Sequence, residues 1–468
     1  MTKNKKILFL IPDGVGIRNF LYSDILKNLK QEAQFVFWSA LPKDAFKEIE
    51  SVDQYDIEYF EVPNLIENIQ TRLFREAATF ARLSYNSNKV NNKTILGNWR
   101  KQNKSFKLKQ LYNIAELIGA WSSKKYHRII TLEELSKKKW PTSIIEKYKN
   151  ELKKVNPTSI FITHQRVASL MPICIAAKEL NIPVVSAIYS WDNLPKARLN
   201  IQADKYIVWS EYMKEEMHVY YPEIPSDDIV VTGTPQFEFY NQPERLMSRN
   251  NFAQEYGLDP SKKWICYSGD DILTSPYDQE YLKDIAESVL DKNEIQILFR
   301  RCPVDFSNRY DRVLNNHKDK IISVNPKWNL PDKDKNWGYV FPKIEDVDLL
   351  VNVVHHCELV INLGSTMAHD FAMFDKPCLY INYDQKQSEK WSVKTIYNFQ
   401  HFRSMSGFDA VGWLNNKEEI RTKITLALEK PEATGKDRQK WMQKIIQHPI
   451  HNASSQIANL LLGFNVKQ

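Results

Sequence analysis

The chain has 468 residues, of which 43% are hydrophobic and 26% charged, and its formal net charge is +7. That length exceeds what one hydrophobic core usually serves, so we expect two domains, and the composition is that of a globular chain. No apolar run approaches the ~18–20 residues that a membrane span needs, which predicts a soluble or peripheral protein.

The five cysteines lie in or beside apolar segments without C-x-x-C spacing. They indicate reduced, structural thiols in a cytoplasmic protein and no zinc site.

Basic residues cluster between 72 and 154, for example Lys101, Lys104, Lys107, Lys109, Lys124, Lys125, Arg128 and Lys137-Lys138-Lys139. Such a surface attracts nucleic acid, anionic lipid or phosphorylated substrates, and it also arises from solvated helix faces. No nucleic-acid-binding motif accompanies it, so no nucleic-acid partner is expected. Peripheral contact with an anionic membrane, at the inner face of the cell membrane, stays open.

The first third of the chain alternates apolar strands with helices, as in a doubly wound α/β domain. The predicted elements are strands at 6–12, 35–39 and 57–62 with helices at 17–30 and 44–50. From about 65 to 150 the apolar residues recur at helical spacing, which predicts an all-helical insertion. Alternation then resumes, with strands predicted at 159–164, 184–189, 206–209 and 229–232. We expect an N-terminal Rossmann-like domain over 1–240.

A second series of apolar strands follows a polar segment at 241–251. They are predicted at 264–268, 295–299, 321–324, 359–363 and 378–381, within a second Rossmann-like domain over 241–437. Residues 438–468 read as two helices with no later strand, and we expect them to brace the first domain.

Ligands of open parallel sheets bind outside the carboxyl ends of the strands, so the residues after each strand are the candidate site. In the first half these residues are Asp13-Gly14-Val15-Gly16, His164-Gln165-Arg166 and Ser190-Trp191-Asp192-Asn193. In the second half they are Ser268-Gly269-Asp270-Asp271, Arg300-Arg301 and Gly364-Ser365-Thr366. Two facing lobes with such polar rims predict a cleft.

Two of these residues can act as a base. Asp13 can take a proton or can cap the helix that follows it, and His164 can accept a hydroxyl proton or position a loop or ligand. Trp191, Asp192 and Asn193 suit a sugar ring, and a packed loop would look the same. The first loop lacks the third glycine of G-x-G-x-x-G, so a nicotinamide is not expected, nor is another cofactor.

The second half offers groups for a phosphate. Arg300 and Arg301 end an apolar strand, where guanidinium groups meet either phosphate or a structural carboxylate. At 364–366 the chain turns from a strand into a helix, where Ser365 or Thr366 can cap the helix and its first N–H groups favour an anion. The acid pairs at 270–271 and 332–334 lie in loops. We therefore expect no metal, and cationic groups would stabilise a departing diphosphate.

Taken together, the loop at 190–194, Val231-Thr-Gly-Thr-Pro235, Phe299-Arg-Arg-Cys-Pro303 and the segment from Asp348 to Pro377 resemble GT-B fold glycosyltransferases of bacterial surface-polysaccharide assembly. The resemblance covers most of the chain outside 65–148. It implies two Rossmann-like domains, with the nucleotide-sugar donor in the C-terminal one and a glycan or lipid-linked acceptor in the N-terminal one.

By this resemblance, the expected donor-binding residues are Ser268, Gly269, Arg300, Arg301, Gly364, Ser365, Thr366 and Asp370. The expected catalytic residues are Asp13, His164 and Asp192, and the expected acceptor-binding residues are Gly14, Arg18, Trp191 and Asn193. A nucleotide-sugar epimerase of the same fold and a non-catalytic glycan- or nucleotide-binding scaffold stay open. A polyol-phosphate transferase is a variant of the glycosyltransferase hypothesis.

Overall fold

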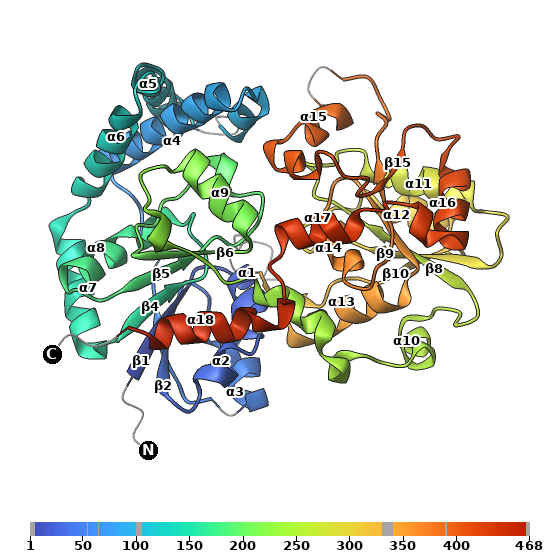
Figure 1. Ribbon diagram of the computed structural model, residues 1–468, viewed down its shortest axis with the longest axis horizontal. Helices are drawn as coiled ribbons and strands as arrows, with labels where there is room; N and C mark the ends of the chain where they lie inside the picture. The colour runs from blue at the N-terminus through green and yellow to red at the C-terminus, as the bar shows by residue number, and fades with distance from the viewer. Residues whose placement is uncertain are drawn as a thin grey trace. The chain divides into compact units, whose positions relative to one another are not determined.

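The computed structural model describes residues 5–53, 55–63, 65–99, 105–329, 340–388 and 391–464, so the acid pair at 332–334 lies outside the described residues. The chain forms two compact units (Figure 1). The first unit comprises Met1–Pro235, Phe399–His401 and Ile445–Gln468. The second comprises Gln236–Asn398 and Phe402–Lys444.

The first unit is built on a seven-stranded parallel sheet in the order β3-β2-β1-β4-β5-β6-β7. Its strands are β1 Lys5–Ile11, β2 Ala33–Ser39, β3 Ile57–Glu61, β4 Ser159–Ile162, β5 Val184–Ala187, β6 Lys205–Val208 and β7 Ile229–Val231. Phe9 of β1 pairs with Phe37 of β2 and with Phe161 of β4, in the buried centre of the sheet. The chain builds outward from β1 in one direction and from β4 in the other, so the topological switch point lies between them.

The single helix predicted at 17–30 is wrong. The chain instead forms α1 Gly14–Gly16, a π-helical turn Ile17–Leu21 and α2 Ile25–Leu29. The Ser23 hydroxyl donates to the carbonyl of Phe20 at 2.7 Å and accepts from the N–H of Ile25 at 3.4 Å. A serine that serves backbone groups in this way competes with a continuous helix.

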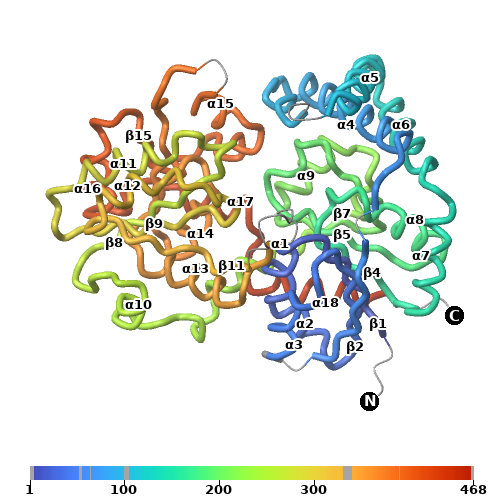
Figure 2. Tube along the Cα trace, turned by 180° about the vertical axis from the view of Figure 1, so that it is seen from behind, coloured from blue at the N-terminus to red at the C-terminus, as the bar shows by residue number. Residues whose placement is uncertain are grey.

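The segment predicted as an all-helical insertion holds α4 Ile69–Lys89, a 3₁₀ turn Lys93–Asn98, α5 Phe106–Ser122, α6 Tyr126–Lys138 and α7 Thr142–Val155. Helix α7 packs with α8 (Met171–Glu179), and its Tyr148 and Leu152 join the core that covers the sheet. Helices α4, α5 and α6 lie side by side (Figure 2). They share a small core of their own, centred on alanines.

Gly119 decides how closely α5 approaches α4. A Cβ at this position would lie 2.8 Å from the carbonyl oxygen of Ala77 and 2.9 Å from a ring carbon of Phe80. The buried alanines Ala77, Ala81 and Ala115 keep the rest of the contact small. With this face of α5 buried against α4, the opposite face is left to the surface.

The two C-terminal helices belong to different units. Helix α17 (Arg438–Ile445) lies in the second unit up to Lys444, whereas α18 (Ala453–Leu462) lies against α2 and β4 of the first unit, as Figures 1 and 2 both show. The Ser159 hydroxyl donates to the carbonyl of Leu461 at 3.2 Å. The first unit is completed by α3 Lys47–Asp53 and α9 Glu211–Tyr220.

The second unit holds a six-stranded parallel sheet in the order β10-β9-β8-β13-β14-β15. Its strands are β8 Lys263–Ser268, β9 Ile295–Arg300, β10 Ile321–Ser323, β13 Leu359–Asn362, β14 Cys378–Ile381 and β15 Gly412–Leu414. Its helices are α10 Arg249–Tyr256, α11 Asp278–Ser288, α12 Asp311–Asn316, α13 Ile344–His356, α14 Met367–Ala372, α15 Val393–Tyr397 and α16 Ile420–Glu429. The predicted fold class, two doubly wound α/β domains, is confirmed.

Two elements of the second unit were not predicted. Strand β15 has three residues, and the antiparallel pair β11 (Trp328–Asn329) and β12 (Phe341–Pro342) has two in each strand. Runs of two residues carry no readable alternation of apolar and polar side chains, and β15 begins at Gly412, which interrupts its apolar run. Across the described ranges, no helix is both long enough and apolar enough to span a bilayer.

Candidate functional site

The switch point of the first sheet brings Asp13 and His164 together. Asp13 follows β1 and His164 follows β4, and their carboxylate Oδ2 and ring Nδ1 lie 2.5 Å apart. Both residues are buried, with 6% and 8% of their surface exposed. The structure therefore joins two residues that are 151 positions apart in the chain.

The local chain geometry explains this contact. Asp13 is the N-cap of α1, where its Oδ1 accepts from the N–H of Gly16 at 3.2 Å, so the capping role and the contact with His164 coexist. A Cβ on Gly16 would lie 2.4 Å from the hydroxyl oxygen of Thr163. Glycine at position 16 thus lets α1 approach the end of β4. Gly14 lies buried in the same turn.

The electrostatics of the pair indicate which of the two residues carries the shared proton. Burial disfavours the charged form of Asp13, but the hydrogen bond and charge of His164 outweigh it, so the pKa of Asp13 is lowered from its usual 3.8. An ionised carboxylate only accepts, so Nδ1 of His164 carries the shared proton. The other ring nitrogen, Nε2, is buried and has no hydrogen-bond partner among the described residues. Tyr189 holds the ring, with centroids 4.1 Å apart.

Asp192 is engaged within its own loop. Its carboxylate accepts from the Ser190 hydroxyl at 2.7 Å and from the Asn193 amide at 2.9 Å, and it pairs with Lys196. Burial alone would raise the pKa of Asp192, but the charges of Lys196 and His401 and the hydrogen bonds from Lys196 and Ser190 hold it well below its usual value. Trp191 is only 3% exposed. In this structure the three predicted residues at 191–193 organise the loop from within.

Arg18 lies in the π-helical turn just after the Asp13 loop. It is half-buried, and its Nε is buried without a hydrogen-bond partner among the described residues. π-Helical turns inside helices are frequent at functional sites. The position is consistent with the predicted acceptor-binding role of Arg18 and adds an unengaged donor to this edge of the sheet.

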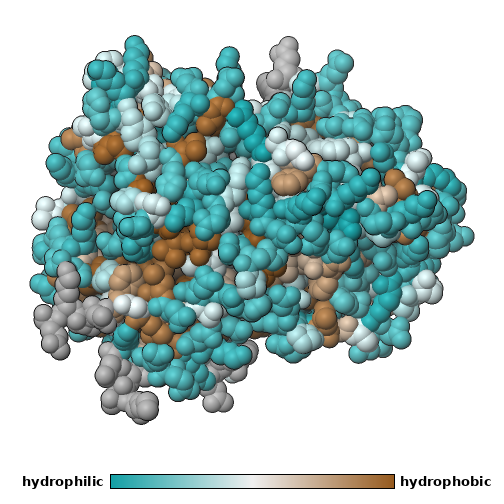
Figure 3. All heavy atoms as spheres, viewed as in Figure 1, coloured by the Kyte–Doolittle hydropathy of each residue, from teal (hydrophilic) through white to brown (hydrophobic). Residues whose placement is uncertain are grey.

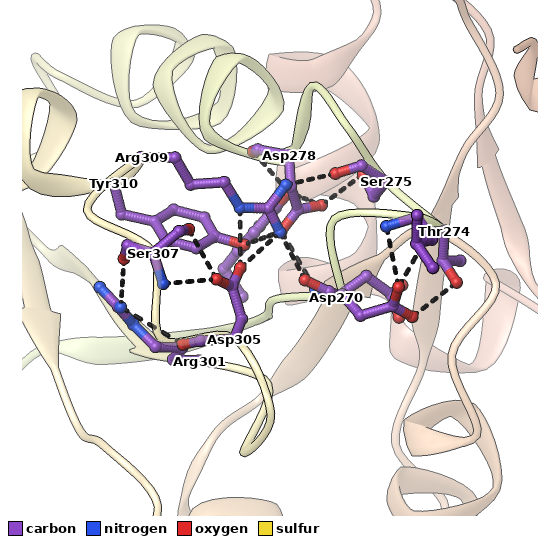
Figure 4. A network of polar contacts seen from close by, with 12 residues as sticks. Asp270, Thr274, Ser275, Asp278, Arg301, Asp305, Ser307, Arg309 and Tyr310 are labelled. Atoms are coloured by element: carbon purple, nitrogen blue, oxygen red, sulfur yellow. Dashed lines mark hydrogen bonds and ion pairs between the residues drawn. The ribbon is translucent and has the colours of Figure 1, made fainter. Parts of the chain in front are cut away.

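In the second unit, the switch point lies between β8 and β13, where Ser268-Gly269 and Gly364 follow the two strands. A Cβ on Gly269 would lie 3.0 Å from the Tyr310 hydroxyl and 3.3 Å from Asp278. Asp278 is fully buried and accepts from the Tyr310 hydroxyl at 2.6 Å and the Ser275 hydroxyl at 2.8 Å (Figure 4). This network supports the turn that carries Ser268 and Gly269.

The two aspartates after this turn have different roles. Asp271 accepts from Leu273, from the N–H of Thr274 and from its hydroxyl, and thereby shapes the loop. Burial and the neighbouring Asp278 and Asp271 raise the pKa of Asp270 well above its usual value. In the described ranges, no group of three or more histidines, cysteines or acids is placed to hold a metal ion.

Arg300 and Arg301 point to different partners. Arg300 is 6% exposed and gives one terminal nitrogen, Nη2, to both oxygens of Asp346 at 2.9 and 3.0 Å, while Nη1 is buried without a partner in the described residues. Arg301 donates to the carbonyl of Ser307 at 2.7 Å. Arg301 also lines a cavity of about 410 Å³ together with Phe306 and Trp328. One ion pair thus coexists with unengaged guanidinium N–H groups.

The turn at 364–366 matches one of its two predicted forms, because the Ser365 hydroxyl accepts from the N–H of Met367, the first residue of α14, at 3.4 Å. Gly364 has φ +74°, and a Cβ there would lie 2.8 Å from the ring of Phe402, so the turn requires glycine. Asn362 accepts from the N–H of Ser365 at 2.8 Å, and Thr366 makes no side-chain capping bond to the helix. Helix α14 has only six residues, which gives its N-terminus fewer aligned peptide dipoles than a full helix. Asp370 accepts from the Tyr240 hydroxyl at 2.7 Å.

Sequence reasoning missed Asp346, Asp278 and Tyr189. Asp346 and Asp278 lie in the first turns of α13 and α11, where acids are common for reasons of helix stability alone, so neither stands out. Tyr189 carried a readable signal because it follows an apolar strand, but it was assigned to the strand itself.

The pair between Asp13 and His164 predicts a pH dependence. A lowered folded-state pKa contributes stability that is present above the unfolded value near 3.8 and is lost as pH falls through the folded value. Asp13→Asn should therefore be less stable than the wild type by about 1–2 kcal/mol at pH 7, and the difference should shrink below pH 3.8. Denaturant unfolding across this range measures it. Asp227→Asn, at an exposed position of the same unit, serves as the control. A difference that does not change with pH would contradict the ionised pair.

No family model and no curated protein matches the chain. Similar solved structures include a glycosyltransferase from Rickettsia africae, 13% identical over 99% of this chain and 100% of that one, with a TM-score of 0.52. UDP-GlcNAc 2-epimerases from Methanocaldococcus jannaschii and Neisseria meningitidis are each 12% identical over 98% of this chain and 100% of theirs, with TM-scores of 0.53 and 0.50.

At these identities the likeness concerns the fold. The chain has the GT-B-like architecture of two Rossmann-like units that these proteins share. In such sheets ligands bind at the carboxyl edge near the switch point. The Asp13–His164 pair and the Ser268-Gly269 turn both lie at the carboxyl edge of their sheets, next to the switch points.

Proposed function

We propose that this protein is a nucleotide-sugar enzyme that transfers a glycosyl group to a hydroxyl of a glycan or lipid-linked acceptor, in the cytoplasm, during surface-polysaccharide assembly. The observation that carries the proposal is the buried Asp13–His164 pair with an unengaged Nε2. An imidazole whose Nδ1–H is held by a carboxylate is the arrangement that activates hydroxyl groups in many enzymes.

The proposed reaction uses the two units differently. In the first unit, Nε2 of His164 takes the acceptor's hydroxyl proton while Asp13 stabilises the resulting imidazolium. The acceptor oxygen bonds to the anomeric carbon, and the bond from that carbon to the diphosphate breaks. Arg18 and the turn at Gly14 would contact the acceptor. Trp191, Asp192 and Asn193 would act by shaping the loop beside it.

In the second unit, the donor would lie along the carboxyl edge of the sheet. Arg301 and the unengaged Nη1 of Arg300 would neutralise the departing diphosphate, with no metal ion required. Ser268, Gly269 and Gly364 would lie beside the phosphates at this edge, with the space next to the two glycines filled by Tyr310 and Phe402. Ser365, Thr366 and Asp370 complete the proposed donor set and would contact the sugar or ribose.

A second candidate is a nucleotide-sugar epimerase, because two of the three similar structures described above carry that activity. We place transfer first because a single imidazole can accept the proton of a hydroxyl group as the new bond forms. A C–H group of a sugar is a far weaker acid and needs more than one such base. Asp192, a further acid of this edge, is committed to Lys196, Ser190 and Asn193. A non-catalytic scaffold would bind a donor and convert nothing.

The first test concerns binding. We expect one of UDP, GDP, CDP, CMP, ADP or TDP to raise the melting temperature of the full chain without magnesium, since a ligand at 100 times its Kd stabilises by ~2.7 kcal/mol. Arg301→Ala should weaken this shift. Arg312→Ala, which removes an exposed arginine of α12, should leave it unchanged. No shift with any nucleotide would contradict a nucleotide-sugar enzyme.

The second test separates the reactions. The protein is incubated in D₂O with the sugar conjugate of the nucleotide that binds, beginning with UDP-GlcNAc if UDP binds, and is followed by proton NMR. Transfer predicts no deuterium at carbon 2 and nucleotide release that rises when glycan acceptors are added. Deuterium at carbon 2 without acceptor would replace transfer with epimerisation. Binding with neither outcome would indicate a scaffold.

A further inference from the structure

Exposed apolar side chains are concentrated in the helical insertion. Thirteen large hydrophobic residues are exposed in the described part of the chain, and seven of them lie between Ile66 and Trp121. Four belong to α5 alone, namely Phe106 (75% exposed), Ile114 (49%), Leu117 (75%) and Trp121 (58%). Figure 3 shows apolar atoms interrupting the polar surface over the region of α4 to α6.

These four side chains lie on one face of α5. At 3.6 residues per turn, the spacing 106, 114, 117 and 121 confines them to an arc of about 80°. The opposite face is buried against α4 through Ala115 and Gly119. We call the exposed set the α5 apolar face. A soluble protein rarely exposes a contiguous apolar patch without a partner for it.

The charges around this face are almost all positive. Between Ser105 and Arg128 there are five basic residues and one acid, Glu116. Lys107, Lys109, Lys124 and Lys125 are exposed. Glu116 accepts from the indole N–H of Trp99 at 2.7 Å, which ties it into the insertion. The guanidinium of Arg128 lies 3.7 Å above the ring of Trp121. Cations thus stand at both ends of the apolar face.

We propose that the α5 apolar face docks the protein on the surface of an anionic lipid bilayer. Helices that lie in a membrane interface combine an apolar face containing Trp, Phe or Leu with flanking lysines and arginines. The apolar side chains would enter the boundary between headgroups and acyl chains, and the lysines would contact anionic headgroups. The surface uses none of the residues proposed for the reaction, so the inference does not rest on the proposed function.

The charge pattern selects a membrane over a second copy of the chain. A symmetric dimer through α5 would bring the same basic residues of two copies together, which is unfavourable. An anionic bilayer instead neutralises them. It also accommodates a narrow apolar strip without a matching groove.

The test is flotation of the full-length protein with vesicles of phosphatidylcholine, alone or mixed with phosphatidylglycerol. We expect flotation only with the anionic vesicles and a decrease as salt is added. Leu117→Ser/Trp121→Ser should lower vesicle binding about tenfold or more. Replacing Lys107, Lys109, Lys124 and Lys125 by Gln should abolish the preference for anionic vesicles. The control Leu290→Ser/Leu426→Ser, at exposed leucines of the second unit, should bind like the wild type.

Circular dichroism and thermal unfolding, measured on the same samples, show that each variant is folded. No flotation with anionic vesicles at low salt would overturn the proposal, as would equal binding by Leu117→Ser/Trp121→Ser and the wild type. Size-exclusion chromatography with light scattering tests whether a second copy of the chain binds the α5 apolar face instead. A dimer that this variant dissociates, without vesicle binding, would assign the face to self-association and also overturn it.

Discussion

His164→Ala is expected to lower turnover of the nucleotide sugar about 10²–10⁴-fold, the range typical of general acid–base catalysis. The reason is that Nε2 of His164 is buried and unengaged within the described residues, while Nδ1 is held by Asp13 at 2.5 Å. The loss should appear in kcat, because the proposed donor groups belong to the second unit. Release of nucleoside diphosphate from the sugar nucleotide found in the binding screen measures it.

Two companion variants make the result specific. Asp13→Asn should lose less activity than His164→Ala because the amide can still meet the ring, although without stabilising an imidazolium. His218→Ala, at an exposed histidine of α9, should be fully active. Nucleotide-induced thermal shifts should be the same in all variants. If His164→Ala turned over at the wild-type rate while still binding nucleotide, the base assignment would be wrong.

Arg82→Ala is expected to destabilise the first unit by about 1.5–3 kcal/mol, the range for hydrogen bonds to charged groups, because the guanidinium is buried and both partner carboxylates are partly exposed. Arg82 is 1% exposed and reaches from α4 to Glu133 of α6 at 2.8 Å and to Glu223 after α9 at 2.7 Å. It also donates to the carbonyl of Tyr220 at 2.9 Å. Its loss would leave two carboxylates facing each other with no cation between them.

Hydrogen exchange measures this destabilisation locally. A global unfolding transition would not, because a protein of two units need not unfold in one step. Amides of α4 and α6 should exchange faster in Arg82→Ala, and those of the second unit should not change. Burial already raises the pKa of Glu133 against the opposing charge of Arg82, so the destabilisation should lessen as pH falls and the acids protonate. Adding Glu133→Gln and Glu223→Gln should restore part of the loss. Unchanged exchange in α4 would show that the pair contributes little.

Local sequence patterns were sufficient for the α/β class. Apolar runs such as the one before Asp13 predicted the strands to within a few residues, because burial on both faces of a parallel sheet demands continuous hydrophobicity. Helix α10 ends at Gly257, where the φ of +71° suits glycine. The rule that ligands lie after strand ends then singled out Asp13, His164, Ser268 and Gly364.

Other features depend on contacts that no local pattern encodes. The π-helical turn after Gly16 arises where side chains compete with backbone hydrogen bonds. Helix α14 stops after Ala372, although the apolar pattern continues to Phe374. The sequence could not predict which anion Arg300 binds, because its partner Asp346 lies 46 residues later and on another element. The packing around the strand ends decided that part of its charge is satisfied internally.

The sequence by itself determined that the protein consists of alternating strands and helices with polar residues at the strand ends, because each element's apolar period is a property of neighbouring residues. Only the tertiary structure decided that β4 lies beside β1, so that His164 meets Asp13 across 151 residues, and that Gly119 seats α5 on α4 with its apolar face outward. Strand order and helix packing are set by burial and steric fit between distant parts of the chain. These contacts cannot be predicted from the local sequence around either residue.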